Sequence, residues 1–221
     1  MAESGSDFTS KERIYKEIRR SIITGHLEPD ARLDVQELAE RYGSSVTPVR
    51  DALHMLGQEG LVTIKPRSGY FVAYMTLKQL RDMLEIREIL EVAAVERAAA
   101  RIDERQLAQL REVHAGYTGD DDESYDRYTD ENRRFHRLVA EASGNEELAA
   151  MLTQVHDRLA RFMVMRRGGK SQPNTHARIV DALRGHDLAG ARQAMLDEIK
   201  ETRDALLDQV VTREGKNWRI S

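Results

Sequence analysis

The stretch that decides the fold covers residues 33–72 and reads LDVQELAERYG (33–43), SSVTPVRDALHMLGQEG (44–60), LVTI (61–64), KPRSG (65–69) and YFV (70–72). In its first half, apolar residues return at helical spacing, first at Val35, Leu38 and Ala39 and then at Val49, Ala52, Leu53 and Leu56. Gly43 and Gly60 mark the points where these two helices end. The pattern predicts two short helices joined by a tight turn, the arrangement that lays a second helix into the major groove of DNA.

The start of each helix carries a local signal of its own. The Asp34 side chain is placed to accept a hydrogen bond from the amide of Glu37, and Glu37 completes a capping box. Ser45 or Thr47 is expected to cap the second helix. Pro48 is tolerated in the first turn of that helix, because no intrahelical donor is lost there.

Two β-prone runs follow the second helix. LVTI (61–64) and YFV (70–72) are short and rich in β-branched and aromatic residues, and KPRSG (65–69) between them is turn material. The order predicts a two-stranded wing with Lys65 and Arg67 at its tip. Cations at such a tip can reach the phosphate backbone or the minor groove of DNA.

Four motifs in this stretch, ELA (37–39), TPVRDAL (47–53), EGLV (59–62) and PRSG (66–69), resemble the winged helix of GntR-family transcription regulators. The resemblance implies a regulator that binds a palindromic operator in double-stranded DNA as a homodimer. The residues expected to contact DNA are Arg41, Ser45, Val46, Thr47, Arg50, Lys65, Arg67 and Gly69. The family commonly has arginine where this chain has Val46, so we expect a guanine contact to be missing there and Val46 to touch a thymine methyl group instead.

The overall charge excludes a broad basic surface. The chain carries a net charge of −4, and residues 1–75 contain ten Lys and Arg against eleven Asp and Glu. DNA binding must therefore depend on a local face, for which the candidates are Arg41, Arg50, Lys65 and Arg67, joined by Lys11 and His54.

Cysteine usage and hydropathy suggest where the protein is found. The chain contains no cysteine, which leaves neither disulfides nor thiolate zinc sites. It also shows no signal peptide and no apolar run of about eighteen residues. We therefore expect a cytoplasmic protein without a membrane span.

The rest of the chain predicts a second, helical domain. A length of 221 residues with 40% apolar content suits two compact domains. We expect a winged helix-turn-helix over residues 1–75 and an effector-binding and dimerisation domain over residues 76–221. The predicted fold class is mainly α, with three helices and a β-hairpin wing followed by an all-helical antiparallel bundle. The bundle helices are expected to begin at or just after Thr76, Asp103, Tyr125, Asn145, Thr175 and Asp187.

The segment REILE (87–91) resembles the opening helix of the FCD-type effector domain, the all-helical module of the FadR subgroup of GntR regulators. This resemblance implies a small-molecule effector, expected to be an organic acid. Arg87 is then the residue expected to pair with the effector, because a guanidinium suits a bidentate carboxylate contact. The alternative is that Arg87 pairs with Glu91, one helical turn later.

Four polar residues of this domain predict a metal site. Asn132 and His136 are four residues apart and so project from one helical face, while His176 and Glu198 lie on two later helices. The resembled domain usually has a carboxylate or asparagine and then three histidines here, around a divalent metal, and this chain has Glu198 in place of the third histidine. Two imidazoles, one carboxylate and one amide oxygen can hold Zn, Ni, Mn or Fe(II). Three other histidines are expected at the surface: His114, His156 and His186.

Two questions about this site stay open in the sequence. The same polar residues could form a metal-free pocket that binds the effector directly. The His/His/Glu cluster could also belong to a metal-dependent enzyme that activates a bound water. No general base lies beside these ligands in the sequence, which argues against the enzyme. The attached DNA-binding domain also makes ligand sensing a simpler explanation of the cluster than catalysis. We therefore predict a ligand-responsive transcription regulator.

Overall fold

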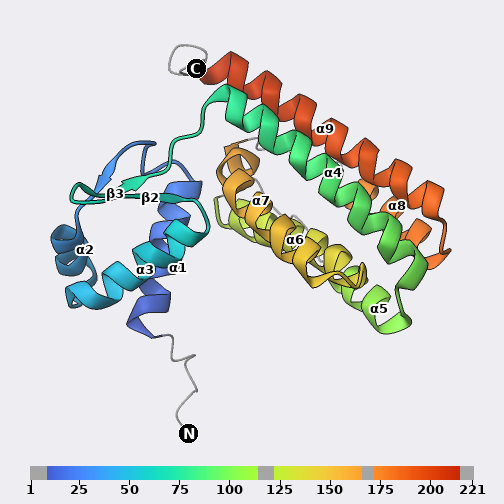
Figure 1. Cartoon of the computed structure of the whole chain (residues 1–221), viewed down its shortest axis with the longest axis horizontal. Coiled ribbons are helices and arrows are strands. Elements are labelled where there is room, and N and C mark those ends of the chain that lie inside the picture. Colours follow the sequence, from blue (N-terminus) through green and yellow to red (C-terminus); the bar gives the residue numbers. More distant parts are fainter. Residues whose placement is uncertain (1–8, 114–121, 166–171, 215–221) are drawn as a thin grey trace, which may run out of the picture. The chain divides into compact units, whose positions relative to one another are not determined.

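The structure, a computed structural model, describes residues 9–113, 122–165 and 172–214 (Figure 1). It forms two compact units, Met1–Tyr74 and Met75–Ser221. The predicted fold class is confirmed, because the described residues are mainly helical and carry one small antiparallel sheet. Within these ranges, no helix combines the length and the apolar character needed to cross a membrane.

The N-terminal unit is built from three helices and a small sheet. Its elements are α1 (Ser10–Ile23), β1 (Arg32–Leu33), α2 (Val35–Tyr42), α3 (Val46–Gln58), β2 (Val62–Lys65) and β3 (Gly69–Val72). Thr9 caps α1 in a capping box with Glu12. The apolar face of α1 is buried through its isoleucines, and it shares one core with Val49 and Leu53 of α3.

The helix-turn-helix forms as predicted, with two differences in capping. The Glu37 side chain returns no hydrogen bond to Asp34, so Asp34 caps α2 without the predicted capping box. Asp34 Oδ1 accepts hydrogen bonds from the amides of Gln36 (2.8 Å) and Glu37 (3.2 Å). Gly43 ends α2 in the left-handed conformation, with φ of 59°, which glycine adopts without a Cβ clash. Ser45 occupies the N-cap position of α3, but its side chain makes no capping hydrogen bond. The position of α3 therefore depends on its buried face more than on its cap.

The wing contains a third strand that the sequence pattern did not predict. β3 lies between β1 and β2 in an antiparallel sheet, with Arg32 and Thr63 both opposite Phe71. The chain enters β1 through Asp30, whose φ is 62° and whose amide donates to the Val72 carbonyl at 3.0 Å. β1 is two residues long, which is too short to show an alternating pattern. Because β1 directly precedes α2, it ties the sheet to the helical core.

The C-terminal unit is a bundle of helices. They are α4 (Leu77–Arg101), α5 (Glu104–Glu112), α6 (Asp122–Ala142), α7 (Glu146–Met165), α8 (Gln172–Arg184) and α9 (Leu188–Glu214). The predicted caps are confirmed at Thr76, Asp103, Asn145 and Asp187, whose side chains accept from backbone amides of the first turn. α8 begins at Gln172, earlier than the predicted Thr175. Pro173 fits there because a proline in the first turn costs no helical hydrogen bond.

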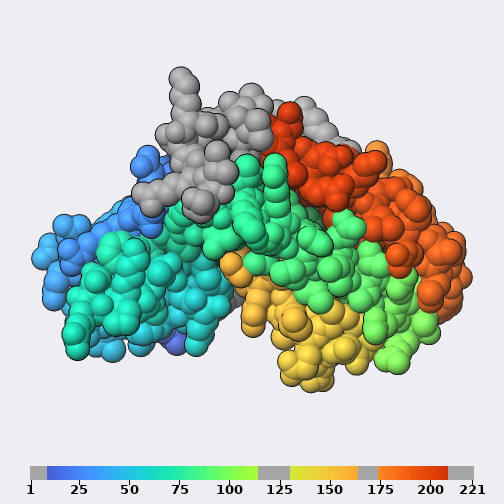
Figure 2. Space-filling model, turned by 45° about the horizontal axis from the view of Figure 1, so that its top comes forward, coloured from blue at the N-terminus to red at the C-terminus, as the bar shows by residue number. Residues whose placement is uncertain are grey.

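The helix α4 is the one against which most of the bundle packs. It lies beside α9, as the green and red segments of Figures 1 and 2 show, and it also packs against α6, α7 and α8. A helix surrounded in this way is normally apolar on every covered face. Two charged residues, Arg87 and Glu91, nevertheless have no exposed surface. They mark the centre of the bundle as a polar site.

Candidate functional site

The outer face of α3 carries residues predicted to read DNA bases. Ser45, Thr47 and Arg50 are exposed. Val46 is half-buried and packs against the core of the unit. The opposite face is anchored by Val49, which has no exposed surface. The start of α3 therefore presents a short polar row, with the half-buried Val46 at the first position of the helix.

The other predicted DNA-contacting cations are also exposed. They are Arg41, in the last turn of α2, and Lys65 and Arg67 at the wing tip. The Lys65 ammonium lies 4.3 Å from the centre of the Phe71 ring, a cation–π contact that orients it. Gly69 has φ of 107°, a conformation that side chains rarely adopt, so the glycine is required for this turn.

One contact that the sequence pattern did not reveal joins the wing to α3. The Tyr70 hydroxyl lies 3.2 Å from His54 Nε2, and the two rings meet edge to face at 5.7 Å. His54 was expected only as an additional cation on the DNA-binding face. Its contact with Tyr70 instead fixes the wing relative to α3.

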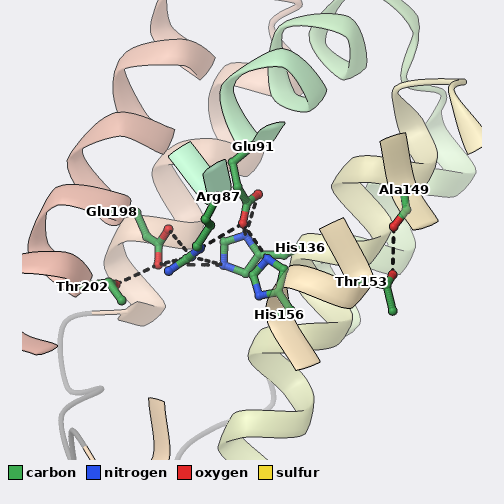
Figure 3. Close-up of polar contacts among 8 residues, drawn as sticks. All are labelled: Arg87, Glu91, His136, Ala149, Thr153, His156, Glu198 and Thr202. Atoms are coloured by element: carbon green, nitrogen blue, oxygen red, sulfur yellow. Dashed lines mark hydrogen bonds and ion pairs between the residues drawn. The ribbon is translucent and has the colours of Figure 1, made fainter. Parts of the chain in front are cut away.

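A second group of polar residues lies buried in the C-terminal unit (Figure 3). Each is at most 5% exposed, and they come from five helices: Arg87 and Glu91 of α4, His136 of α6, His156 of α7, His176 of α8 and Glu198 of α9. Figure 3 draws all of them except His176. Buried charges are costly unless they are paired, so the pairing pattern describes the chemistry of the site.

Arg87 is the cation of this group. Its Nε donates to Glu91 Oε1 at 3.3 Å, and its Nη2 donates to Glu198 Oε2 at 3.2 Å and to Oε1 at 3.4 Å. Burial alone would lower the pKa of Arg87, but the adjacent carboxylates of Glu198 and Glu91 outweigh it and raise that pKa. Arg87 therefore stays charged. It pairs with Glu91, as the alternative reading predicted, and also with Glu198, 111 residues away.

The hydrogen bonds of His136 define which ring nitrogen carries its proton. Nδ1 lies 3.0 Å from Glu91 Oε2, and Nε2 lies 3.4 Å from Arg87 Nη2. A guanidinium has only donors, so Nε2 must be the acceptor and the proton is assigned to Nδ1. Nε2 therefore accepts from Arg87 Nη2, and Glu198 Oε1 lies 3.8 Å from the same nitrogen.

Glu91 also binds His156, which corrects a prediction. His156 was expected at the surface, yet it is buried and its Nε2 lies 2.7 Å from Glu91 Oε1. Burial lowers the pKa of His156 to about 4, so the imidazole is neutral at neutral pH. Burial by itself opposes the charge on Glu91, but the adjacent His136 and His156 hold its pKa well below the usual range. The helical spacing with Leu152 and Leu159, both buried, was the signal in the sequence that His156 faces inward.

The other two histidines expected at the surface have different outcomes. His186 is exposed, as predicted, and its Nδ1 lies 2.8 Å from the Ala99 carbonyl oxygen. His114 lies outside the described residues.

The structure brings three of the four predicted metal ligands together. One donor atom from each of His136, His176 and Glu198 lies within 4.8 Å of the others, and all three residues are buried. The His176 ring stacks on Phe135, with the ring centres 3.9 Å apart, and meets His136 edge to face. Asn132, one helical turn before His136, is 8% exposed. Its Oδ1 is buried and makes no hydrogen bond among the described residues.

These donors fit a divalent metal. Imidazole nitrogens combined with carboxylate and amide oxygens suit Zn, Ni, Mn and Fe(II). A second cluster, formed by Glu91, His136 and His156, also places three donor atoms within 4.8 Å. Its members are already joined by hydrogen bonds of 2.7–3.0 Å, so their N–H groups and lone pairs are used by one another. The set of His136, His176 and Glu198 contains three of the four predicted ligands, and Arg87 donates to two of its members, Glu198 and His136.

Both units match known protein families. Residues 10–72 match "Bacterial regulatory proteins, gntR family", and residues 82–201 match the "FCD domain". The chain therefore belongs to the GntR family of bacterial transcription regulators and carries an FCD domain.

Individual relatives agree with this assignment over most of the chain. An uncharacterized HTH-type transcriptional regulator of Bacillus subtilis (strain 168), YdhC, is 28% identical over 213 residues, which cover 92% of this chain and 93% of the relative. The HTH-type transcriptional repressor RspR of Escherichia coli (strain K12) is 26% identical over 212 residues, covering 94% and 92%. The solved structure of E. coli McbR/YncC has the same fold, with a TM-score of 0.73 at 22% identity over 91% of this chain and 99% of that one. These relatives are regulators and not enzymes, so the metal-dependent enzyme is set aside.

Proposed function

We propose that this protein is a ligand-responsive, sequence-specific DNA-binding regulator that acts as a homodimer on a palindromic operator. Within the GntR family we place it in the FadR subgroup, with the winged helix over residues 1–75 and the effector domain over residues 76–221. A single α3 reads too few base pairs to be specific, so a two-fold dimer with half-sites about one helical turn apart or closer supplies the rest. The eight predicted contact residues on α2, α3 and the wing form the DNA-binding face.

The main support for a role in ligand sensing is the buried cluster of metal-donor side chains in the C-terminal unit. We assign a divalent metal to His136, His176 and Glu198, with Asn132 as a further ligand. The support is the 4.8 Å spacing of the three donors, the 3.8 Å separation of His136 Nε2 from Glu198 Oε1, and the Asn132 Oδ1 without a hydrogen bond in the described chain. When bound, the metal supplies a Lewis-acid centre that a carboxylate oxygen can join.

The charges of the cluster favour a cation together with an anion. Arg87 brings one positive charge, and Glu91 and Glu198 bring two negative charges. With neutral imidazoles, as metal binding requires, the cluster holds a net charge of −1. A divalent ion changes this to +1, and a monocarboxylate then brings it to zero. Because a buried net charge is costly, the metal and a small organic acid should favour each other's binding.

The same geometry suggests how binding reaches the DNA-binding unit. An acid held between the metal and Arg87 would change how α4 packs against α9, since Arg87 and Glu198 lie on these two helices. α4 follows the winged helix directly in the chain. A change in its packing would alter the spacing of the two winged helices in a dimer. A ligand that binds one of two such arrangements more tightly shifts the equilibrium between them.

Native mass spectrometry and a gel shift test the proposal together. Purified protein should run as a dimer that carries a divalent metal and a co-purified small acid. It should also retard DNA from upstream of its own gene. A monomer on an asymmetric single half-site would contradict the dimer. Protein that stays free of metal under every purification condition, yet responds to an acid, would support the metal-free pocket in place of the metal site.

A further inference from the structure

The guanidinium of Arg87 lies against two of the atoms that are assigned to the metal. Its Nη2 is 3.2 and 3.4 Å from the two Glu198 oxygens and 3.4 Å from His136 Nε2 (Figure 3). Glu198 and His136 thus have a cation beside them already. This cation belongs to the protein itself.

A metal at these ligands would be close to Arg87. His136 Nε2 and Glu198 Oε1 are 3.8 Å apart, a separation that one ion with bonds of about 2.1 Å can bridge. Any ion in that position has Arg87 Nη2 within roughly 4 Å, since Nη2 is a near neighbour of both ligand atoms. A dication and a guanidinium at such a distance repel each other strongly in a buried site, where no solvent separates them.

We propose that Arg87 is an internal cation that competes with the metal for Glu198 and His136. A metal held by Glu198 and His136 would compete with the guanidinium for the Glu198 carboxylate, and the pairing of Glu198 with Arg87 would lower the affinity for the metal. This inference deepens the proposed function and rests on the metal site assigned there.

The surroundings of Arg87 would allow the displaced guanidinium to bind a carboxylate ligand. Glu91 accepts from Nε at 3.3 Å, a hydrogen bond that does not involve Glu198. Arg87 Nη1 is buried and makes no hydrogen bond within the part of the chain that the structure describes. A carboxylate ligand can therefore take donors from Nη1 and Nη2 together. By reciprocity, a carboxylate that neutralises Arg87 raises the metal affinity, and the metal raises the carboxylate affinity.

The effect depends on the acidic residue at position 198. A carboxylate attracts both the metal and Arg87, whereas a neutral imidazole at this position would bind the metal and leave Arg87 with Glu91 alone. The competition between Arg87 and the metal is thus a consequence of Glu198, which stands where the resembled domain usually has its third histidine.

The test is a Zn²⁺ titration of full-length protein, stripped with a chelator, against a zinc-binding dye. Arg87→Gln removes the cation and keeps a hydrogen-bonding side chain, and it should bind Zn²⁺ at least about tenfold more tightly than wild type. The matched control is Arg203→Gln, which removes the same charge from a half-exposed ion pair (Arg203–Glu88, 3.1 Å) between the same two helices. The control should bind Zn²⁺ as wild type does.

A second measurement does not depend on whether Arg87→Gln folds. Acetate, as a simple carboxylate probe, should tighten Zn²⁺ binding by wild type and by Arg203→Gln. Equal or weaker Zn²⁺ binding by folded Arg87→Gln, or no effect of acetate on wild type, would overturn the competition while leaving the metal site in place. Absence of Zn²⁺ binding by both wild type and Arg87→Gln would contradict the proposed metal site and therefore also the competition.

Discussion

The imidazole of His136 on α6 donates its Nδ1–H to the carboxylate of Glu91 on α4, with Nδ1 3.0 Å from Oε2. This hydrogen bond fixes the ring so that Nε2 lies 3.4 Å from Arg87 Nη2 and 3.8 Å from Glu198 Oε1. Histidines that bind metals are commonly oriented in this way by a carboxylate on the other ring nitrogen. In the proposed metal site, Glu91 is therefore a positioning residue that would act through His136.

Replacing Glu91 with glutamine should weaken both metal binding and the fold. Glu91→Gln keeps the shape but removes the charge that pairs with Arg87 and orients His136. We expect Zn²⁺ affinity to fall by about 10–100-fold. The free energy of unfolding should fall by about 3 kcal/mol, because Arg87 loses a buried partner. Zinc competition and urea unfolding measure the two effects. The control Glu88→Gln, at the half-exposed pair with Arg203, should change each by little.

The buried His156 predicts a pH dependence of stability in metal-free protein. Its pKa is lowered to about 4 in the folded state, from 6.5 without the fold. Between these values the unfolded chain binds a proton that the folded chain does not. The stabilisation is therefore complete above about pH 6.5 and is lost as the pH falls toward 4, to a total of about 3 kcal/mol.

Urea unfolding at a series of pH values tests this prediction. The pH dependence of His156→Gln should be shallower than that of wild type between about pH 6.5 and 4, because glutamine does not titrate. Identical slopes in the two proteins would show that another group is responsible.

Local signals explain what the sequence predicted well. Caps such as Asp34 and Thr76 act on amides two or three residues away, so each is visible in a short window of sequence. Asn132 and His136 share a helical face for the same reason. The strand β1 was missed because two residues carry no periodicity, and its partner β3 lies far along the chain.

The pairing inside the bundle was beyond the reach of local patterns. Glu91 and His156 are 65 residues apart, and Arg87 and Glu198 are 111 apart. Helical spacing alone shows that such residues point inward, but which charges meet depends on how five helices pack. The partner of His156 and the Arg87–Glu198 pair were therefore not foreseen, whereas the burial of His156 could have been predicted from its helical spacing with Leu152 and Leu159.

The exposed Arg50 on α3 should be important for DNA binding. We expect Arg50→Ala to cost more than about 1 kcal/mol of specific binding, consistent with a base contact or a close phosphate contact. The measurement is a fluorescence anisotropy titration of operator DNA at fixed salt. Arg192→Ala is the charge-matched control, since it removes an exposed cation from α9 in the other unit. Equal losses in the two variants would point to a general charge effect and contradict a specific contact.

Val46 should set sequence preference and not overall affinity. Its half-buried side chain at the start of α3 cannot read guanine, whereas an arginine there can form a bidentate contact. Val46→Arg should therefore shift the preferred operator toward a guanine at one position in each half-site. Selection from a randomised DNA pool, performed with wild type and variant, compares the two preferences. An unchanged preference would place Val46 away from the bases.

The central claim is that the buried cluster of the C-terminal unit binds a divalent metal. Elemental analysis of wild type and of the double variant His136→Ala/His176→Ala, with a gel shift in parallel, tests it most directly. Wild type should carry about one metal ion per chain, and the double variant should lose the ion and still bind DNA. Full metal stoichiometry in the double variant would contradict the site.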